Sequence, residues 1–235
     1  MSDSSDNHTL SLHPVAYAHN GFSDKFGIPR QACADTTLRT RIVFCPAYRS
    51  DDAIRGIESF SHLWLVWGFH ASVQSPDHTP SLTVRPPRLG GNTRMGVFAT
   101  RSPYRPNAIG LTSVRLVAVE HDAHGAPVLV VEGADMLDGT PIYDIKPYLN
   151  YCDSHADARD GFAGTAPVRL LTVSWPSSVP EGLPLRELQE ILEQDPRPAY
   201  HDDPERVYGI DYAGWNIHFR VADGLLVVVE VTKIK

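Results

Sequence analysis

Cysteine is scarce in this chain of 235 residues, which contains only Cys33, Cys45 and Cys152. An odd number at scattered positions, without a Cys-x-x-Cys pair, argues against a disulfide framework or a zinc cluster and fits a reducing cytoplasm. Long apolar runs are also missing: the stretch Leu63–Phe69 is far shorter than the ~20 residues of a membrane helix. The first fifteen residues are polar and acidic, so the sequence predicts neither a membrane span nor a signal peptide.

Acidic residues are absent from one long window of an otherwise acidic protein. The formal net charge is -7, yet no Asp or Glu occurs from residue 78 to residue 119. All cationic side chains of that window are arginines, whose planar groups favour bidentate recognition of carboxylate or phosphate. Each arginine alone also fits an exposed strand or loop, but the whole set favours an anionic partner: Arg85, Arg88, Arg94, Arg101, Arg105 and Arg115.

Familiar catalytic signatures are missing as well. The chain has no G-x-G-x-x-G after an expected strand, no phosphate-binding G-x-x-x-x-G-K-[ST], no H-E-x-x-H and no G-x-S-x-G. Among the eleven histidines, His62 and His70 bracket one expected strand and would face the same side. They would lie roughly 26 Å apart, too far to share one ion. The sequence therefore predicts no metal site.

Short β-favoured segments separated by Gly, Pro, Asn and Asp follow one another through the first two thirds of the chain. The only expected helix there is Asp51–Phe60, with Asp51 as its cap. Strands at such intervals, without long helices between them, predict a mainly β fold with a closed or nearly closed antiparallel sheet. The expected strands are His13–His19, Leu38–Phe44, Ser61–His70, Gly96–Thr100, Leu111–Glu120, Pro127–Glu132 and Ile142–Ile145.

A change of composition marks a second, smaller unit. Residues 152–165 are rich in Asp, Ser, Ala and Gly and read as a linker. Beyond it, Pro184–Gln194 has an apolar face at helical spacing, and a hairpin is expected from Trp215–Val221 and Leu225–Val231. We therefore expect three parts: a disordered N-terminus at 1–12, a β-barrel domain at 13–160, and a small α+β domain at 161–235.

Two polar clusters are unusual for purely structural sequence. Residues 95–110 place Arg101, Arg105 and Asn107 on an expected loop, where binding groups tend to lie. Residues 135–148 carry several carboxylates, and a hairpin tip at Asp138-Gly139 explains only part of them. A loop of arginine, asparagine and aromatics facing a carboxylate-bearing turn would suit a polar, zwitterionic or nucleotide ligand. Three functions stay open on these residues: an enzyme acting on such a ligand, a non-catalytic barrel that binds it, and a hydrolase using Asp135, Asp138 and Asp144.

Long motifs in a fixed order resemble the TsaA-like family of tRNA methyltransferases. The motifs are residues 52–64, Phe69-His70, residues 85–91, the two polar clusters and residues 195–200, within a resemblance that runs from about Val15 to the C-terminus. The resemblance implies a single-sheet antiparallel β-barrel catalytic domain, S-adenosylmethionine as methyl donor, and a homodimer. It also implies the reaction: methylation of N6 of threonylcarbamoyladenosine at position 37, in the anticodon loop of a threonine-type tRNA.

The resemblance also assigns residues to the cofactor pocket. Gln31-Ala32-Cys33 stands where the family usually has Gln-Pro-Gly, so this chain departs from the family at the two positions after Gln31. We expect the adenine in an apolar slot near Phe69 and Leu111, and the methionine or ribose groups on polar atoms of the turn. The full expected set is Gln31, Ala32, Cys33, Phe69, His70, Arg101, Leu111, Leu137, Asp138, Gly139 and Thr140.

The remaining assignments concern catalysis and tRNA. Because the accepting N6 is conjugated to the purine and the carbamoyl group, a base that removes its proton would help by about 10²–10⁴-fold. Asp138 and His70 are the candidates, with Asp144 third, although Asp138 also fits a role in holding the turn and His70 a role in contacting the cofactor. The residues expected to contact tRNA are Arg88, Arg105, Lys146, Arg197 and Tyr200.

Overall fold

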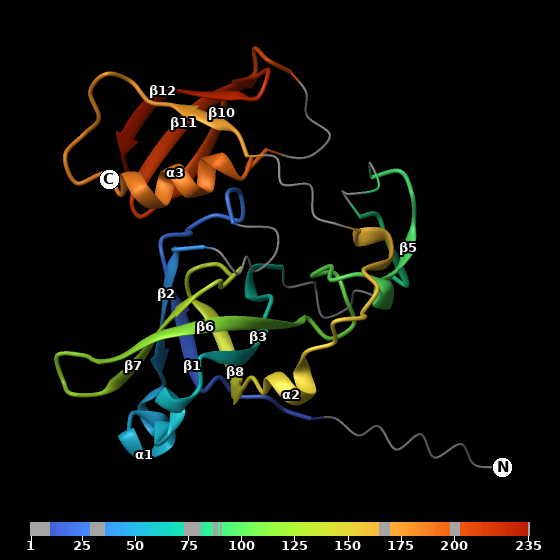
Figure 1. Ribbon diagram of the computed structural model, residues 1–235, viewed down its shortest axis with the longest axis vertical. Helices are drawn as coiled ribbons and strands as arrows, with labels where there is room; N and C mark the ends of the chain where they lie inside the picture. Colours follow the sequence, from blue (N-terminus) through green and yellow to red (C-terminus); the bar gives the residue numbers. More distant parts are fainter. Residues whose placement is uncertain are drawn as a thin grey trace.

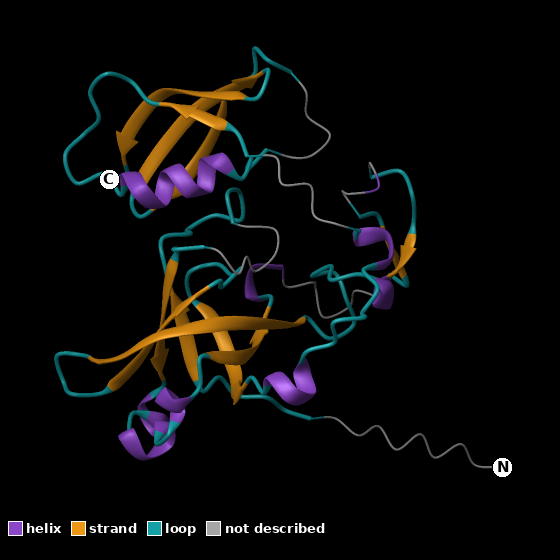
Figure 2. Ribbon diagram, viewed as in Figure 1, coloured by secondary structure: helices purple, strands orange, loops and turns teal. Residues whose placement is uncertain are grey.

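The computed structural model describes residues 10–28, 36–72, 81–86, 89, 91–164, 170–197 and 203–234. Its main body is a closed barrel of six strands in the order β1-β2-β7-β6-β3-β8, with every neighbouring pair antiparallel (Figures 1 and 2). This confirms the expected mainly β class. The barrel strands are β1 (Ala16–His19), β2 (Arg39–Phe44), β3 (His62–Gly68), β6 (Ile109–His121), β7 (Pro127–Glu132) and β8 (Thr140–Pro147).

Alternation of apolar side chains explains why these segments close into a barrel. In β3 every second residue is buried, so Leu63, Leu65 and Trp67 point into the interior. Ile42 of β2 and Ile142 of β8 meet them in the same hydrophobic core. Closing the sheet pairs both edges of each strand, which removes the exposed edges that an open sheet would leave.

The strand order shows that the Asp138-Gly139 turn does not join two neighbouring strands. β7 and β8 follow each other in the sequence, yet β8 pairs with β1 and β3 while β7 pairs with β2 and β6. The expected hairpin with this turn at its tip is therefore wrong. Residues 133–139 instead form a connection across one end of the barrel, and Gly139 adopts a positive φ of 73° within it.

Local backbone geometry divides the expected helix at 51–60. The structure has a short α1 (Asp51–Ile54) and a 3-10 turn η2 (Ile57–Ser59), separated at Gly56, whose φ is +87°. The helix cap is Ser50, whose side chain accepts a hydrogen bond from the amide of Asp52, and not Asp51. A further 3-10 turn, η1 (Pro46–Tyr48), precedes it.

The described residues within the range 81–108, between β3 and β6, form an arm beside the barrel (Figure 1). It contains the two-stranded pair β4 (Thr83–Val84) and β5 (Met95–Gly96), followed by the 3-10 turn η5 (Val97–Ala99). The strand expected at 96–100 is therefore mostly a 3-10 turn. His70 begins another such turn, η3 (His70–Ser72), beyond the end of β3, so it does not share that strand with His62 as expected.

A second sheet lies toward the C-terminus, with the strand order β10-β11-β12-β9. The expected helix is confirmed as α3 (Leu185–Glu193), which buries Leu188, Ile191 and Leu192 in the core of this unit. The expected hairpin is also confirmed, and sequence periodicity missed the two outer strands. The strands are β9 (Thr172–Ser174), β10 (Tyr208–Tyr212), β11 (Trp215–Ala222) and β12 (Leu225–Lys233); α2 (Asn150–Asp153) and η6 (Gly161–Ala163) precede them.

Residues that precede β2 belong to the core of the C-terminal unit. Phe22 and Leu38 are buried in its hydrophobic cluster, and Phe22 forms a β-bridge with Tyr212. Burial, with the charges of Glu187 and Glu190 nearby, raises the pKa of Tyr212 to about 12. The segment before β2 therefore connects the two sheets.

The structure does not test two of the expectations. The domain boundary near residue 160 remains a prediction, and most of the expected disordered N-terminus, residues 1–9, lies outside the described residues. Within the described ranges, no helix is both long enough and apolar enough to cross a membrane.

Candidate active site

The antiparallel barrel brings motifs that are distant in the sequence to one of its ends. β1 ends there at His19 and β3 at Gly68, while β6 begins there at Ile109 and β8 at Thr140. The chain therefore places Phe69-His70, the first residues of β6 and the 137–140 segment around one opening. We call this the site end of the barrel.

We define the Asp138 turn as residues Leu137–Thr140. Three of its backbone amides donate hydrogen bonds to carbonyl groups of the protein. The amide of Asp138 donates to the carbonyl of Phe22 at 2.9 Å, and the amide of Gly139 donates to that of Ala18 at 2.8 Å. The amide of Thr140 donates to the carbonyl of Leu137 at 3.2 Å. The turn therefore presents a carboxylate and carbonyl oxygens, which are acceptors, because the amides of Asp138, Gly139 and Thr140 are engaged within the protein.

The Asp138 carboxylate both holds the turn and reaches solvent. Its Oδ1 accepts a hydrogen bond from the amide of Asn20 at 3.0 Å and lies 3.4 Å from Nδ1 of His19. Its side chain is nevertheless 45% exposed, so an approaching ligand can contact it. The structural role considered for Asp138 is thus present in the fold, and it is compatible with a catalytic role.

His70 lies against the same turn. Its Nδ1 is 3.4 Å from Oγ1 of Thr140, and that hydroxyl donates to the carbonyl of Leu137 at 2.7 Å. Thr140 is buried, whereas His70 is exposed. Two of the expected site motifs, which are seventy residues apart in the sequence, are therefore in contact.

Aromatic and polar side chains form a network of contacts next to the site end. The ring of Phe69 packs edge-on against Trp67 with centroids 4.4 Å apart. Nε1 of Trp67 donates to Oγ1 of Thr112 at 3.0 Å, and that hydroxyl donates to Oδ1 of Asp135 at 2.7 Å. Asp135, which we considered as a hydrolase carboxylate, is therefore part of a supporting network.

Leu111 lies on the other face of the sheet from this network. Its neighbours Gly110 and Thr112 are buried, while Leu111 itself is 58% exposed on the outside of β6. We expected an apolar slot near Phe69 and Leu111. In the structure Phe69 packs on the barrel core, whereas Leu111 is open to solvent. Among the described residues, no group of three or more His, Cys, Asp and Glu side chains could hold a metal ion.

The described arginines of the acid-free window differ in their partners and in their exposure. Arg115 pairs with Glu132, a carboxylate that is only 5% exposed and that also lies 3.3 Å from Nε of Arg39. Arg105 donates from Nη1 to the carbonyl of Thr100 at 3.1 Å. Arg101 is exposed on the loop between η5 and β6. Arg115 therefore has a carboxylate partner on the neighbouring strand, although its side chain is 52% exposed, and Arg101 adds exposed positive charge on the loop.

The other expected tRNA contacts are partly engaged within the chain. Nζ of Lys146 lies 2.8 Å from a carboxylate oxygen of Asp144, the third candidate base, and both residues are on β8. Arg197 makes two hydrogen bonds to Asp195, at 2.8 and 2.9 Å, and its side chain is only 11% exposed. The remaining expected site residues lie outside the described ranges: Gln31, Ala32, Cys33, Arg88 and Tyr200.

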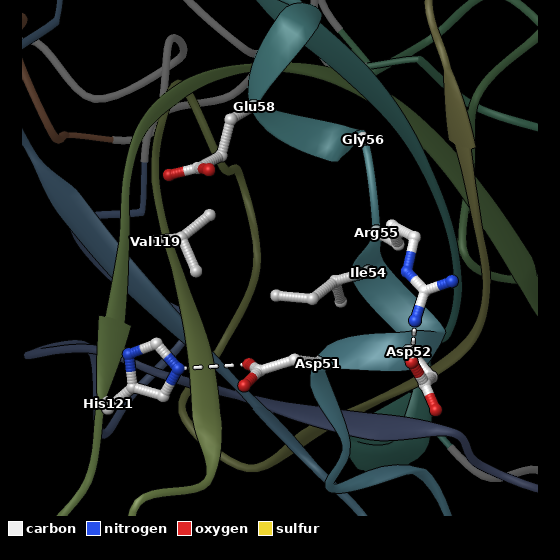
Figure 3. Close-up of a pocket in the computed structure, with 8 residues that line it drawn as sticks. All are labelled: Asp51, Asp52, Ile54, Arg55, Gly56, Glu58, Val119 and His121. Carbon is white, nitrogen blue, oxygen red and sulfur yellow. Dashed lines mark hydrogen bonds and ion pairs between the residues drawn. The ribbon is translucent and has the colours of Figure 1, made fainter.

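Figure 3 shows a pocket at the other end of the barrel, between α1, η2 and the last residues of β6. His121 reaches across it to Asp51 at 2.9 Å, and Arg55 pairs with Asp52. None of the expected cofactor-binding residues that the structure describes lines this pocket. Its lining is Asp51, Asp52, Ile54, Arg55, Gly56, Glu58, Val119 and His121.

Comparison with known proteins shows that most of the chain is similar to tRNA-modifying enzymes. Residues 17–154 match the model of the tRNA-methyltransferase O N-terminal domain, and residues 174–234 match the TrmO C-terminal domain. A tRNA (adenine(37)-N6)-methyltransferase of Escherichia coli is 41% identical over 229 residues, which are 92% of this chain and 94% of that protein. These matches agree with the resemblance found in the motifs.

A second relative and a solved structure agree with this result. A Pseudomonas aeruginosa protein named "Putative S-adenosylmethionine-dependent methyltransferase RcsF" is 41% identical over 222 residues, which are 90% of this chain and 92% of that protein. A crystal structure of TrmO from P. aeruginosa superposes with a TM-score of 0.77 and 34% sequence identity, covering 97% of this chain and 99% of that one.

Proposed function

The chain belongs to the tRNA-methyltransferase O family, and on that premise we propose that it transfers a methyl group from S-adenosylmethionine to N6 of threonylcarbamoyladenosine at position 37 of a threonine-type tRNA. The observation that carries this proposal is the contact between His70 and the Asp138 turn at one end of the closed barrel. A half-exposed carboxylate, an exposed imidazole and an aromatic ring meet there. Because its substrate is a tRNA, we place the enzyme in the cytoplasm.

The side chains at the site end suit the methyl donor. Its ammonium group and ribose hydroxyls are hydrogen-bond donors, and the Asp138 turn offers a carboxylate and carbonyl oxygens as acceptors. Phe69, held edge-on by Trp67, provides an aromatic surface beside which an adenine ring can pack. We assign Phe69, His70 and the Asp138 turn to the donor.

The chemistry needs alignment and a proton acceptor. S-adenosylmethionine supplies a methyl group on a positively charged sulfur. Holding the reacting groups ~3–3.5 Å apart and in line can contribute roughly 7–11 kcal/mol. Asp138 accepts the N6 proton, and the hydrogen bond from the Asn20 amide keeps its carboxylate in place while it does so. His70 orients the donor against the turn.

The tRNA meets the arm and the C-terminal unit. Arg101 stands exposed on the loop after η5, and Arg105 lies four residues farther along. Guanidinium groups there can pair with the phosphates of the anticodon loop or with the threonyl carboxylate. Lys146 and Arg197, which pair with Asp144 and Asp195 in the free protein, contribute only by exchanging a carboxylate partner for a phosphate. Arg88 and Tyr200 are assigned to the same surface from the motifs alone.

We also infer a homodimer. The chain from Phe98 to Leu111 exposes four large apolar side chains next to the site end: Phe98, Tyr104, Ile109 and Leu111. A second copy that covers them would remove these exposed apolar side chains from water. Light scattering should give twice the mass of the chain, and a monomer at micromolar concentration would contradict this inference.

The direct test compares two forms of the same tRNA. Purified protein, labelled S-adenosylmethionine and threonine tRNA bearing threonylcarbamoyladenosine at position 37 are incubated, and the nucleosides are analysed by mass spectrometry. We expect one added methyl group per tRNA, on the modified adenosine, and none on the same tRNA with unmodified adenosine 37. Binding of tRNA without methyl transfer would instead support a non-catalytic RNA-binding barrel.

A further inference from the structure

Asn20 connects three separate segments at the site end. Its side-chain Nδ2 donates to the carbonyl of Met136 at 2.9 Å and to Oγ1 of Thr40 at 3.3 Å. Its Oδ1 accepts from the amide of Phe22 at 2.9 Å, and its own amide donates to Asp138. One half-buried side chain thus ties the end of β1 to β2 and to the connection that carries the Asp138 turn.

This connection depends on such bonds because it has no strand pairing. Residues 133–139 cross the barrel end between β7 and β8, which are not neighbours in the sheet. Met136 is buried at 1% exposure, so removal of the Asn20 amide would leave its carbonyl without that donor in a position that solvent does not readily reach. An unsatisfied buried acceptor costs about 1–3 kcal/mol, which the loop can relieve only by moving.

Residues 20–25 also contact the turn that begins at His70 and the second sheet. Nζ of Lys25 donates to the carbonyl of Ala71, the residue after His70, at 2.7 Å. The ring of Phe22 packs edge-on against Tyr212 with centroids 5.0 Å apart. A Cβ added at Gly21 would lie 2.6 Å from the Tyr212 ring, so the backbone approaches β10 closely. Residues 20–25 therefore touch the Asp138 turn, the His70 turn and the C-terminal sheet.

We propose that Asn20 is a positioning residue for methyl transfer: its side-chain amide fixes the Asp138 turn against β2, and the Phe22–Tyr212 contact anchors that arrangement to the C-terminal sheet. The inference deepens the proposed function and rests on it. It gives the C-terminal unit a role in the geometry of the donor site in addition to any contact with tRNA.

Two substitutions separate the hydrogen bond from the Asn20 side chain to the Met136 carbonyl from the local bond that Asn20 accepts from the Phe22 amide. Asn20→Ala removes every side-chain bond. Asn20→Ser keeps a hydroxyl that can accept from the amide of Phe22, but it is too short to reach the carbonyl of Met136. The matched control is Asn216→Ala, which removes an amide that donates to Asp211 within the β10–β11 hairpin, away from the Asp138 turn.

Steady-state kinetics, calorimetry and hydrogen exchange then give distinct readouts. We expect both Asn20 variants to raise the KM and Kd for S-adenosylmethionine by roughly tenfold, the equivalent of one lost buried hydrogen bond, with the KM for tRNA within about twofold of wild type. The amides of Asp138 and Gly139 should exchange faster in both variants without any ligand. Asn216→Ala should match the wild type in all four measurements.

Each other outcome has a defined meaning. Wild-type donor affinity in Asn20→Ser would restrict Asn20 to its local turn and overturn the proposal. Lower melting temperature with unchanged donor KM and unchanged exchange at residues 138–139 would reduce Asn20 to general stability and would also overturn it. If wild-type protein binds no S-adenosylmethionine, the proposed function fails; the exchange rates then decide separately whether Asn20 holds the turn.

Discussion

Asp138→Asn is expected to lower kcat for methyl transfer by about 10²–10⁴-fold, the usual contribution of a general base. The asparagine Oδ1 can still accept the hydrogen bond from the Asn20 amide, so the turn should keep its shape while its proton acceptor is lost. The KM for S-adenosylmethionine should therefore stay within about threefold of wild type. Single-turnover kinetics with modified tRNA measures the chemical step directly.

The matched control is Asp122→Asn. Asp122 also uses a carboxylate oxygen to accept backbone hydrogen bonds, from the amides of His124 at 2.8 Å and Ala126 at 2.9 Å, so both variants change the same kind of local contact. Only the Asp138 variant should lose the chemical step. Near wild-type turnover in Asp138→Asn, with normal melting temperature, would leave Asp138 with a structural role alone.

His70→Ala should act mainly on the donor, raising the KM for S-adenosylmethionine by about tenfold or more and lowering kcat by a smaller factor. The reason is that His70 is exposed beside the buried Thr140 hydroxyl, where it can contact a ligand without itself supporting the fold. Calorimetric titration of the donor into wild-type and variant protein measures the loss. His124→Ala, in the exposed turn between β6 and β7, is the control.

A pH-rate profile distinguishes the two candidate bases. If His70 were the base, His70→Ala would remove the low-pH step of the kcat profile together with most of kcat. Our account expects kcat to retain its pH dependence in His70→Ala. Loss of the step with an unchanged donor KM would transfer the base role from Asp138 to His70.

Side-chain periodicity predicted the elements whose burial follows from their own sequence. β3 alternates buried and half-exposed residues, and α3 places Leu188, Ile191 and Leu192 on one face, so both could be located from the chain alone. Phe69-His70 and the Asp138 turn were selected from motifs, and the fold brings them into contact. Their roles stay predictions until the variants are measured.

Pairing between distant segments explains what the sequence could not predict. The Asp138-Gly139 pair has the local signature of a hairpin, and only the placement of β8 between β1 and β3 makes it a crossing loop. Arg115 looked like part of a phosphate-binding strip because its partner, Glu132, lies on the neighbouring strand and outside the window. The sequence around Asn20 did not indicate a role for it, apart from its position before a glycine. The proposed role depends on a hydrogen bond to Met136, which lies far along the chain.

A crystal structure with S-adenosylhomocysteine, the donor after methyl loss, tests the central claim most directly. Our account predicts the ligand at the site end of the barrel, with its adenine beside Phe69 and its polar groups on His70 and the Asp138 turn. A ligand found instead in the pocket between Asp51 and His121, with the Asp138 turn unoccupied, would contradict the account.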